Sequence, residues 1–193
     1  MKKFLAIDFL FVFFALCSFT FGASAQSTQK IASAQIAYAH YSAFNEGDMV
    51  INAGVGLGTF IYDRDFSVIL PPITASFEYG IVDLFEGQGG IGIGGYAGYL
   101  LRKNDVFGNV GDLVVGPRGL FHYQFVDNLD TYTGIMLGYD IRSFSQKNTP
   151  LSGSTFAFAY FVGARYYFTN HFGAFAELGY GISPVQLGFT FKF

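Results

Sequence analysis

Few side chains in this sequence are of the types that carry out chemistry, and they stand far apart. The three histidines are His40, His122 and His171, and the only cysteine is Cys17. A single cysteine can form neither an internal disulfide nor a cysteine-based metal site. The histidines fall in a leading segment, in a predicted strand and in a predicted turn, so they cannot converge on one metal. We therefore expect no cofactor, no metal and no catalytic residue.

A glycine-rich stretch matches the G-x-G-x-x-G pattern of dinucleotide-binding proteins twice, at Gly87–Gly92 and at Gly90–Gly95. That pattern binds a dinucleotide only when a strand precedes it, a helix follows it and an acidic residue stands about 20 positions further on. Here the glycines continue with period two towards Tyr96 and Tyr99, which is typical of a strand. The motif therefore favours a glycine-lined strand over a nucleotide site.

The composition narrows the class of protein further. The 193 residues are 51% hydrophobic and 20% aromatic, but only 13% are charged. That charged fraction is about half of what soluble domains usually carry. The 11 Lys and Arg residues are outnumbered by 14 Asp and Glu residues, so the chain lacks the basic surface that nucleic acids require. We expect one domain and no nucleic-acid partner.

The first 25 residues have the features of a signal peptide. Lys2 and Lys3 form a charged start, an apolar run follows from Phe9 to Phe21, and a small-x-small site ends at Ala25. The alternative, an uncleaved anchor helix, needs about 20 apolar residues. We predict cleavage after Ala25, a periplasmic N-terminal segment over 26–46, and a barrel domain over 47–193.

Hydrophobic residues alternate with period two through the rest of the chain, and no stretch is apolar enough for a membrane-spanning helix. Such alternation over about 10 residues is typical of strands with one face in lipid. The predicted strands are 49–62, 73–81, 90–101, 113–125, 131–143, 155–168, 174–182 and 185–193. An even number of strands allows a closed antiparallel up-and-down barrel with no unpaired edge.

Charges and glycines share one face of these strands. The seven charged side chains on that face are Glu78, Arg118, Asp140, Arg142, Arg165, Glu177 and Lys192. A basic side chain facing lipid costs roughly 2–4 kcal/mol at the midplane, so we place this face in the barrel interior. Glycines on the same face leave room inside a narrow cylinder. A water-soluble β-sandwich would carry more charged residues on its solvent-facing side, so this alternative fold is disfavoured.

The connections predict an orientation. Those at 63–72, 102–112 and 144–154 are long and polar, whereas 126–130 and 169–173 are short. In outer-membrane barrels long loops face outward and short turns face the periplasm. Both termini are therefore expected in the periplasm. Pro117 interrupts a predicted strand and, lacking an N–H group, predicts a bulge.

The strand pattern and the ending Gly179-Tyr-Gly-Ile-Ser-Pro-Val-Gln-Leu-Gly-Phe-Thr-Phe-Lys-Phe193 resemble the small OmpA/OmpX-type outer-membrane barrels. More narrowly, they resemble the outer-membrane β-barrel domain proteins common in Bacteroidetes. This resemblance implies a monomer in the outer membrane of a Gram-negative bacterium, in contact with lipids and lipopolysaccharide. It also implies that the barrel-assembly machinery recognises the last strand through Phe189, Phe191 and Phe193.

Three functions follow from this architecture. The first is a non-enzymatic barrel plugged by its inner charges, with a structural or surface-interaction role. In that interpretation Arg165 pairs with Glu177, and Arg118 pairs with Asp140, across neighbouring strands. The second is a narrow porin-like pore for small solutes, favoured by the many interior glycines. The third is a lipid-modifying enzyme, which is disfavoured because no histidine lies near the predicted outer rim.

Overall fold

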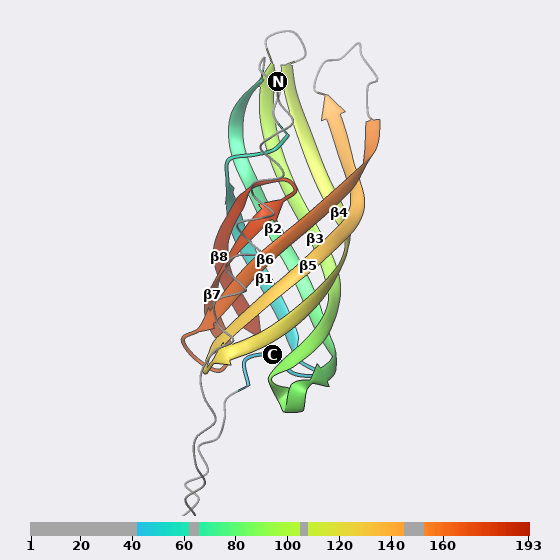
Figure 1. The fold of residues 1–193 in the computed structure, drawn as a ribbon. Helices are drawn as coiled ribbons and strands as arrows, with labels where there is room; N and C mark the ends of the chain where they lie inside the picture. Colours follow the sequence, from blue (N-terminus) through green and yellow to red (C-terminus); the bar gives the residue numbers. More distant parts are fainter. Residues whose placement is uncertain (1–41, 62–65, 105–107, 145–152) are drawn as a thin grey trace, which may run out of the picture. The chain divides into compact units, whose positions relative to one another are not determined.

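The described residues form eight β-strands, and each strand pairs antiparallel with the next. The computed structural model describes residues 42–61, 66–104, 108–144 and 153–193. The strands are β1 (Met49–Leu57), β2 (Phe66–Leu84), β3 (Gly89–Asn104), β4 (Gly108–Val126), β5 (Leu129–Phe144), β6 (Gly153–Tyr167), β7 (Phe172–Tyr180) and β8 (Val185–Lys192). Because β8 pairs back onto β1, the sheet closes into a barrel (Figure 1). The predicted all-β, eight-stranded antiparallel fold is confirmed.

Some of the predictions fall on residues that lie outside this description. These are the signal peptide 1–25 with its cut after Ala25, the first part of segment 26–46, His40, and most of the connection 144–154. They stay predictions.

The two faces of the wall have opposite character. Along β2, Ile73, Phe77 and Tyr79 are exposed on the outside, while the intervening Ser76 and Glu78 are buried inside. Successive side chains of a strand point to opposite faces, so this alternation sorts apolar residues outward and polar residues inward. The same arrangement recurs around the ring and inverts that of a soluble protein, whose apolar residues face a core.

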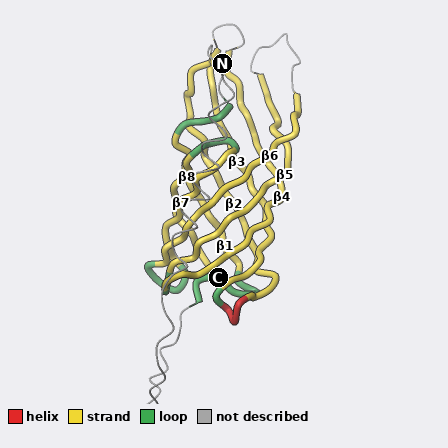
Figure 2. Tube along the Cα trace, in the orientation of Figure 1, coloured by secondary structure: helices red, strands yellow, loops and turns green. Residues whose placement is uncertain are grey.

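The two ends of the barrel differ in their connections. We call the end with the β2–β3, β4–β5 and β6–β7 connections the turn end. The opposite end, with the β1–β2, β3–β4, β5–β6 and β7–β8 connections, is called the hairpin end. At the turn end, the residues Phe85–Gly87 form a single 3-10 turn (Figure 2). Among the described residues, no helix is long and apolar enough to cross a membrane.

Strands β2 to β5 extend further towards the hairpin end than predicted. The β3–β4 ladder continues to the pair Asn104 and Gly108, so most of the connection expected at 102–112 is strand. Most of 63–72 likewise belongs to β2. Polar residues predicted a loop here, but Arg102 and Asp112 form an ion pair across the hairpin inside the barrel, which lets charged residues occupy strand.

Prolines interrupt the sheet without breaking it. Pro117 keeps its place opposite Gly95 of β3, while the β4–β5 ladder omits residues 116 and 117 in constant register. The bulge predicted at Pro117 is therefore wrong, because the missing N–H group costs ladder contacts on one side only. Pro71 and Pro72 lie in the part of β2 that extends past its ladder with β1, next to shifts in register.

The wall is low on one side of the barrel. β7, β8 and β1 have only 9, 8 and 9 residues, whereas β2 to β6 have 15 to 19. Figure 1 shows β7 and β8 ending well below the tops of β4 and β5. Because β7 ends at Tyr180, Ile182 turns into the barrel and is 3% exposed, although the sequence predicts an outward side chain there.

The residues before β1 pack against the turn end. Ala43 and Phe44 are buried, and the Phe44 ring stacks on the His122 imidazole with 3.9 Å between centroids. The Gly47 amide donates to the Gly80 carbonyl at 3.0 Å. We call residues 42–48 the N-terminal strap. Positions 42–46, which the sequence assigns to a separate segment, thus contribute to the barrel.

Candidate functional site: the barrel interior

A buried ionic cluster lies near the turn end, built from four strands. The Arg165 guanidinium is fully buried and donates from Nη1 to Asp130 Oδ2 at 2.9 Å and from Nη2 to Glu78. The His122 imidazole lies between the same two carboxylates, with Nδ1 at 2.9 Å from Asp130 Oδ1 and Nε2 against Glu78. We call these four residues the inner cluster. Each is at most 2% exposed.

The next layer is a single ion pair across the interior. Arg118 of β4 donates to Glu177 Oε1 of β7 at 2.7 Å, and the Tyr132 hydroxyl donates to the same oxygen at 3.0 Å. The Arg118 guanidinium also lies 3.9 Å from the centroid of the Phe161 ring, which allows a cation–π contact. Arg118 and Glu177 thus join β4 and β7, two strands that are not neighbours in the ring.

An apolar layer separates this pair from the hairpin end. Leu100, Val114, Met136 and Ile182 are buried together there, each at most 4% exposed. Ile182 completes this layer because the β7–β8 connection folds over the short side of the barrel. Polar and apolar layers therefore alternate along the interior.

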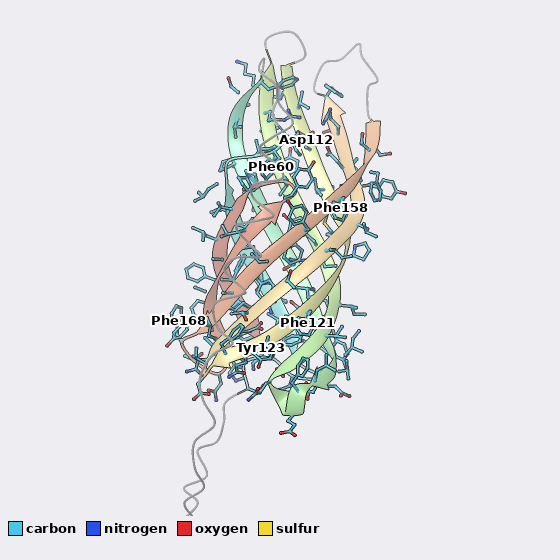
Figure 3. The ribbon with its side chains drawn as sticks, in the orientation of Figure 1. Phe60, Asp112, Phe121, Tyr123, Phe158 and Phe168 are labelled. Atoms are coloured by element: carbon cyan, nitrogen blue, oxygen red, sulfur yellow. The ribbon has the colours of Figure 1, made fainter. Side chains whose placement is uncertain are left out.

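A second ionic cluster lies above the apolar layer. Asp112 is fully buried and accepts from Arg102 Nε and from Arg142 Nε, each at 2.8 Å. Asp140 contacts the Arg142 guanidinium at 3.4 Å, and the Arg142 side chain is 40% exposed. We call these four residues the hairpin-end cluster. Figure 3 marks Asp112 in the upper part of the barrel.

Lys192 holds the N-terminal strap. Its Nζ donates to the carbonyls of Ser42 and Ala43 at 3.3 and 3.2 Å and lies 3.3 Å from the Asp48 carboxylate. The strap is held further by the Ala43 amide, which donates to Gln124 at 2.6 Å. One cation thus joins the last strand to the segment that covers the turn end.

All seven charged side chains that the sequence places inside the barrel point inward, but not in the predicted pairs. Arg165 contacts Glu78 and Asp130 instead of Glu177, and Arg118 contacts Glu177 instead of Asp140. In the β6–β7 ladder Arg165 stands opposite Phe175, two positions from Glu177. Long side chains reach across the narrow interior, so contacts form between strands that the sequence cannot identify as facing.

The sequence does not predict four of these cluster members correctly. Arg102, Asp112 and Asp130 lie in predicted connections. His122 is expected inside the barrel, hydrogen-bonded to neighbours such as Gln124 or Tyr167, but the structure pairs it with Glu78 and Asp130. The parity of the strands carries the missing signal. Asp130 shares the even parity of Gly134 and Asp140, so extending the predicted strand back by a single residue brings it inside.

Glycines make room for these side chains. A Cβ atom on Gly163 would lie 2.5 Å from the Tyr132 ring, and one on Gly92 would lie 2.6 Å from Glu78 Oε1. These contacts are too close for real Cβ atoms, so the large interior side chains occupy the space that these glycines leave. The predicted role of interior glycines is consistent with this geometry.

The outer surface is apolar and rich in aromatic rings. Phe121, Phe158 and Phe168 are 38%, 41% and 58% exposed, and Figure 3 shows their side chains on the wall. The C-terminal Phe189, Phe191 and Phe193 are also exposed. Phe193 and Met49 exchange backbone hydrogen bonds at 3.0 and 3.2 Å, so the chain end completes the ladder that closes the ring.

No model of a known protein family matches the sequence, and no curated protein is significantly similar to it. Solved structures do match. The outer membrane protein OprG from Pseudomonas aeruginosa aligns with a TM-score of 0.50 at 12% identity, covering 79% of this chain and 99% of that chain. Ail from Yersinia pestis gives 0.48 at 19% identity, with 77% and 99% covered.

The N-terminal β-barrel domain of Pseudomonas aeruginosa OprF gives a TM-score of 0.46 at 18% identity, covering 78% of this chain and all of that domain. At such identities a likeness extends to the fold alone, and the likeness to OprG shows that fold. The narrower resemblance to Bacteroidetes barrel domains stays a prediction. The chain is thus an eight-stranded antiparallel barrel of the kind found among transmembrane β-barrels.

Proposed function

We propose that this protein is a small integral barrel of a bacterial outer membrane, with a structural or surface-interaction role and an interior plugged by its own side chains. The observation that carries the proposal is the inverted polarity of the wall. Ile135 and Leu137 are exposed outside, whereas Arg118, Arg165 and Glu177 are buried inside. An apolar outer face is unfavourable in water but favourable in contact with lipid, so this polarity supports a membrane setting.

The geometry of the interior supports a plug over a channel. In the turn-end half, the inner cluster and the Arg118–Glu177 pair occupy the cross-section, and Phe44 covers the opening below them. An eight-stranded barrel is just wide enough for its side chains to fill. Ions crossing this half would have to displace paired, buried charges.

The same geometry favours a non-enzymatic role. His122 has a carboxylate against each ring nitrogen and an aromatic ring stacked on its face. Both nitrogens are therefore engaged, and neither is available to take a proton from a substrate. This supports a structural role for His122 over the lipid-modifying alternative.

The short connections at the turn end support a periplasmic location for that end, because barrels of this kind carry short turns on the periplasmic side. The C-terminus lies at the turn end next to Met49. Phe189, Phe191 and Phe193 are exposed on the last strand, where the assembly machinery is proposed to bind them.

Gel migration and conductance test this proposal. Folded protein should migrate differently on gels before and after boiling, and planar bilayers containing it should show no steady single-channel conductance. A porin of known conductance in the same bilayers checks that the assay detects an open channel. Steady conductance by the unchanged protein would favour the narrow pore.

A substitution at the chain end tests the assembly signal. Phe193→Ala should reduce the amount of folded barrel in the outer membrane of an expressing bacterium, while purified protein refolded in detergent should reach the folded form as before. Phe125→Ala is a matched control, because Phe125 is also exposed on the wall but lies in β4. Equal losses for both variants would contradict the proposed signal.

A further inference from the structure

On the low side of the wall, one edge of β6 pairs with no strand in the described part of the chain. β6 pairs with β7 only from Tyr160 and Tyr180 towards the turn end, so among the described residues Gly153–Ala159 has a strand partner on the β5 side alone. Free edges are usually protected by charges, prolines or bulges. The opposite edge, at the start of β2, has Pro71 and Pro72, whereas the sequence of Gly153–Ala159 contains no proline and no charge.

A cavity of about 270 Å³ lies at this edge. It touches Ala157 on the inner face of β6 and also Phe156 and Phe158 on the outer face. Its floor is formed by Met136 and Ile182 of the buried apolar layer. The cavity therefore passes around the edge and connects the barrel interior with the apolar outer surface.

One end of the cavity is polar. Asp140 and Arg142 of the hairpin-end cluster line it there, together with Thr155. Among the described residues, the buried Asp140 Oδ1 atom has no hydrogen-bond partner, and Oδ2 has one long contact of 3.4 Å with Arg142. A buried carboxylate oxygen without a donor is costly, so this position favours a ligand group that donates a hydrogen bond.

We propose that this edge cavity binds a single-chain amphiphile that enters sideways from the lipid, with its alkyl chain on the apolar floor and a donating head group, a hydroxyl or an amine, on Asp140. The proposal goes beyond a plugged barrel and rests on the proposed membrane setting. The turn-end half of the barrel stays closed, so the ligand occupies the upper interior without passing through.

The dimensions agree with such a ligand. Asp140 stands opposite Thr155, and Met136 stands opposite Ala159, four residues further along the β5–β6 ladder. At about 3.3 Å per residue this is a length of roughly 13 Å, which is that of a medium alkyl chain. The cavity volume of about 270 Å³ is slightly smaller than the roughly 300 Å³ at which the range for small-molecule sites begins, as expected for a slender single-chain ligand.

Tryptophan fluorescence provides the test, because the chain contains no tryptophan. Phe158→Trp places a reporter at the cavity, and Phe189→Trp places a matched one on the lipid-facing wall of β8. Each full-length variant is incorporated into phosphatidylcholine vesicles and titrated with ω-bromoundecanol, whose bromine quenches fluorescence on contact. Gel migration before and after boiling confirms folding first.

We expect saturable quenching of the Phe158→Trp variant at probe concentrations at least about tenfold below those that quench the control, and recovery on adding dodecanol or dodecylamine. Adding Ala157→Leu, which fills the cavity, should abolish the saturable phase. Identical, non-saturating curves for the two reporters in well-folded protein would overturn the proposal, while leaving the membrane barrel itself intact.

The head group is tested separately. Asp140→Asn removes the negative charge, so dodecylamine should compete about tenfold less well, whereas dodecanol should change little. Dodecanoate, which has no donor when ionised, should compete weakly in both proteins. Equal competition by dodecanoate and dodecylamine in the unchanged protein would refute the assignment of Asp140.

A strand partner at the same edge is the competing outcome. Thr155→Cys in the chain lacking its first 25 residues, and so lacking Cys17, gives a single thiol at the edge. Rapid disulfide-linked dimers in vesicles, formed at the same rate with or without dodecanol, would show that a second copy covers the edge and would overturn the amphiphile site. Slow formation of disulfide-linked dimers would support the amphiphile site.

Discussion

The two halves of this barrel are built from the same alternating strands but differ in closure. In the turn-end half all eight strands pair around the ring, the inner cluster is at most 2% exposed, and the N-terminal strap covers the opening. Of the described strands, β2 to β6 alone continue into the hairpin-end half. There the Arg142 side chain is 40% exposed and a cavity of about 270 Å³ opens at β6.

The difference shows that the contribution of an interior ion pair to stability depends more on whether the ring is closed around it than on which residues form it. The inner cluster and the hairpin-end cluster each contain two carboxylates and two basic side chains in contact. Where the ring is closed, removing one member of an ion pair leaves the other charged group buried and out of reach of water, which lowers the free energy of unfolding by several kcal/mol. Where the wall is low, water can replace the lost partner, as at a protein surface.

The largest effect is expected at Arg165, which is fully buried between Glu78 and Asp130. Arg165→Ala leaves two buried carboxylates with only His122 beside them and should lower the free energy of unfolding by about 3–5 kcal/mol. Urea unfolding of the barrel folded in detergent measures this. A decrease of less than about 1 kcal/mol in the free energy of unfolding would contradict the view that ion pairs in the closed half contribute more to stability than those in the open half.

Phe44 tests whether the strap contributes to the closed half. Phe44→Ala removes a buried ring from the face of His122 and should cost about 1.5–3 kcal/mol in the same unfolding experiment. Phe85→Ala, at a ring that is 60% exposed at the same end, is the control and should have little effect. Equal effects would mean that the strap adds no more stability than an exposed turn residue.

Interior crowding in the closed half predicts a penalty for adding a single methyl group. Gly163→Ala brings Cβ within 2.5 to 2.7 Å of Tyr132 atoms and should destabilise the barrel by about 1–3 kcal/mol. Gly119→Ala is the matched control in a strand, because its Cβ would meet nothing within 4 Å. Thermal unfolding monitored by gel migration would compare the two, and a neutral Gly163→Ala would mean that the interior is loosely packed.

The smallest effect is expected in the open half. Arg142→Ala leaves Asp112 paired with Arg102 and removes the long contact of Asp140, but water can reach the vacated position. We expect a change of at most about 1 kcal/mol in urea unfolding. A loss as large as that of Arg165→Ala would show that the hairpin-end cluster is as isolated from water as the inner cluster.

Much of the wall could be predicted from local pattern. Alternation identified every strand and placed Glu78, Arg165 and Glu177 inside, because a strand sends successive side chains to opposite faces whatever its neighbours are. Strand ends were less predictable. Arg102 and Asp112 look like loop residues until their ion pair across the β3–β4 hairpin is seen.

The sequence by itself determined which side chains face lipid and which face inward, since that depends only on strand parity and on the cost of charge in hydrocarbon. Only the tertiary structure decided the partners inside. Contacts such as Arg118 with Glu177 join strands that are distant in the sequence, and the stagger of the closed ring sets which residues meet at each level. The same stagger, with β7 ending at Tyr180, left the edge of β6 open.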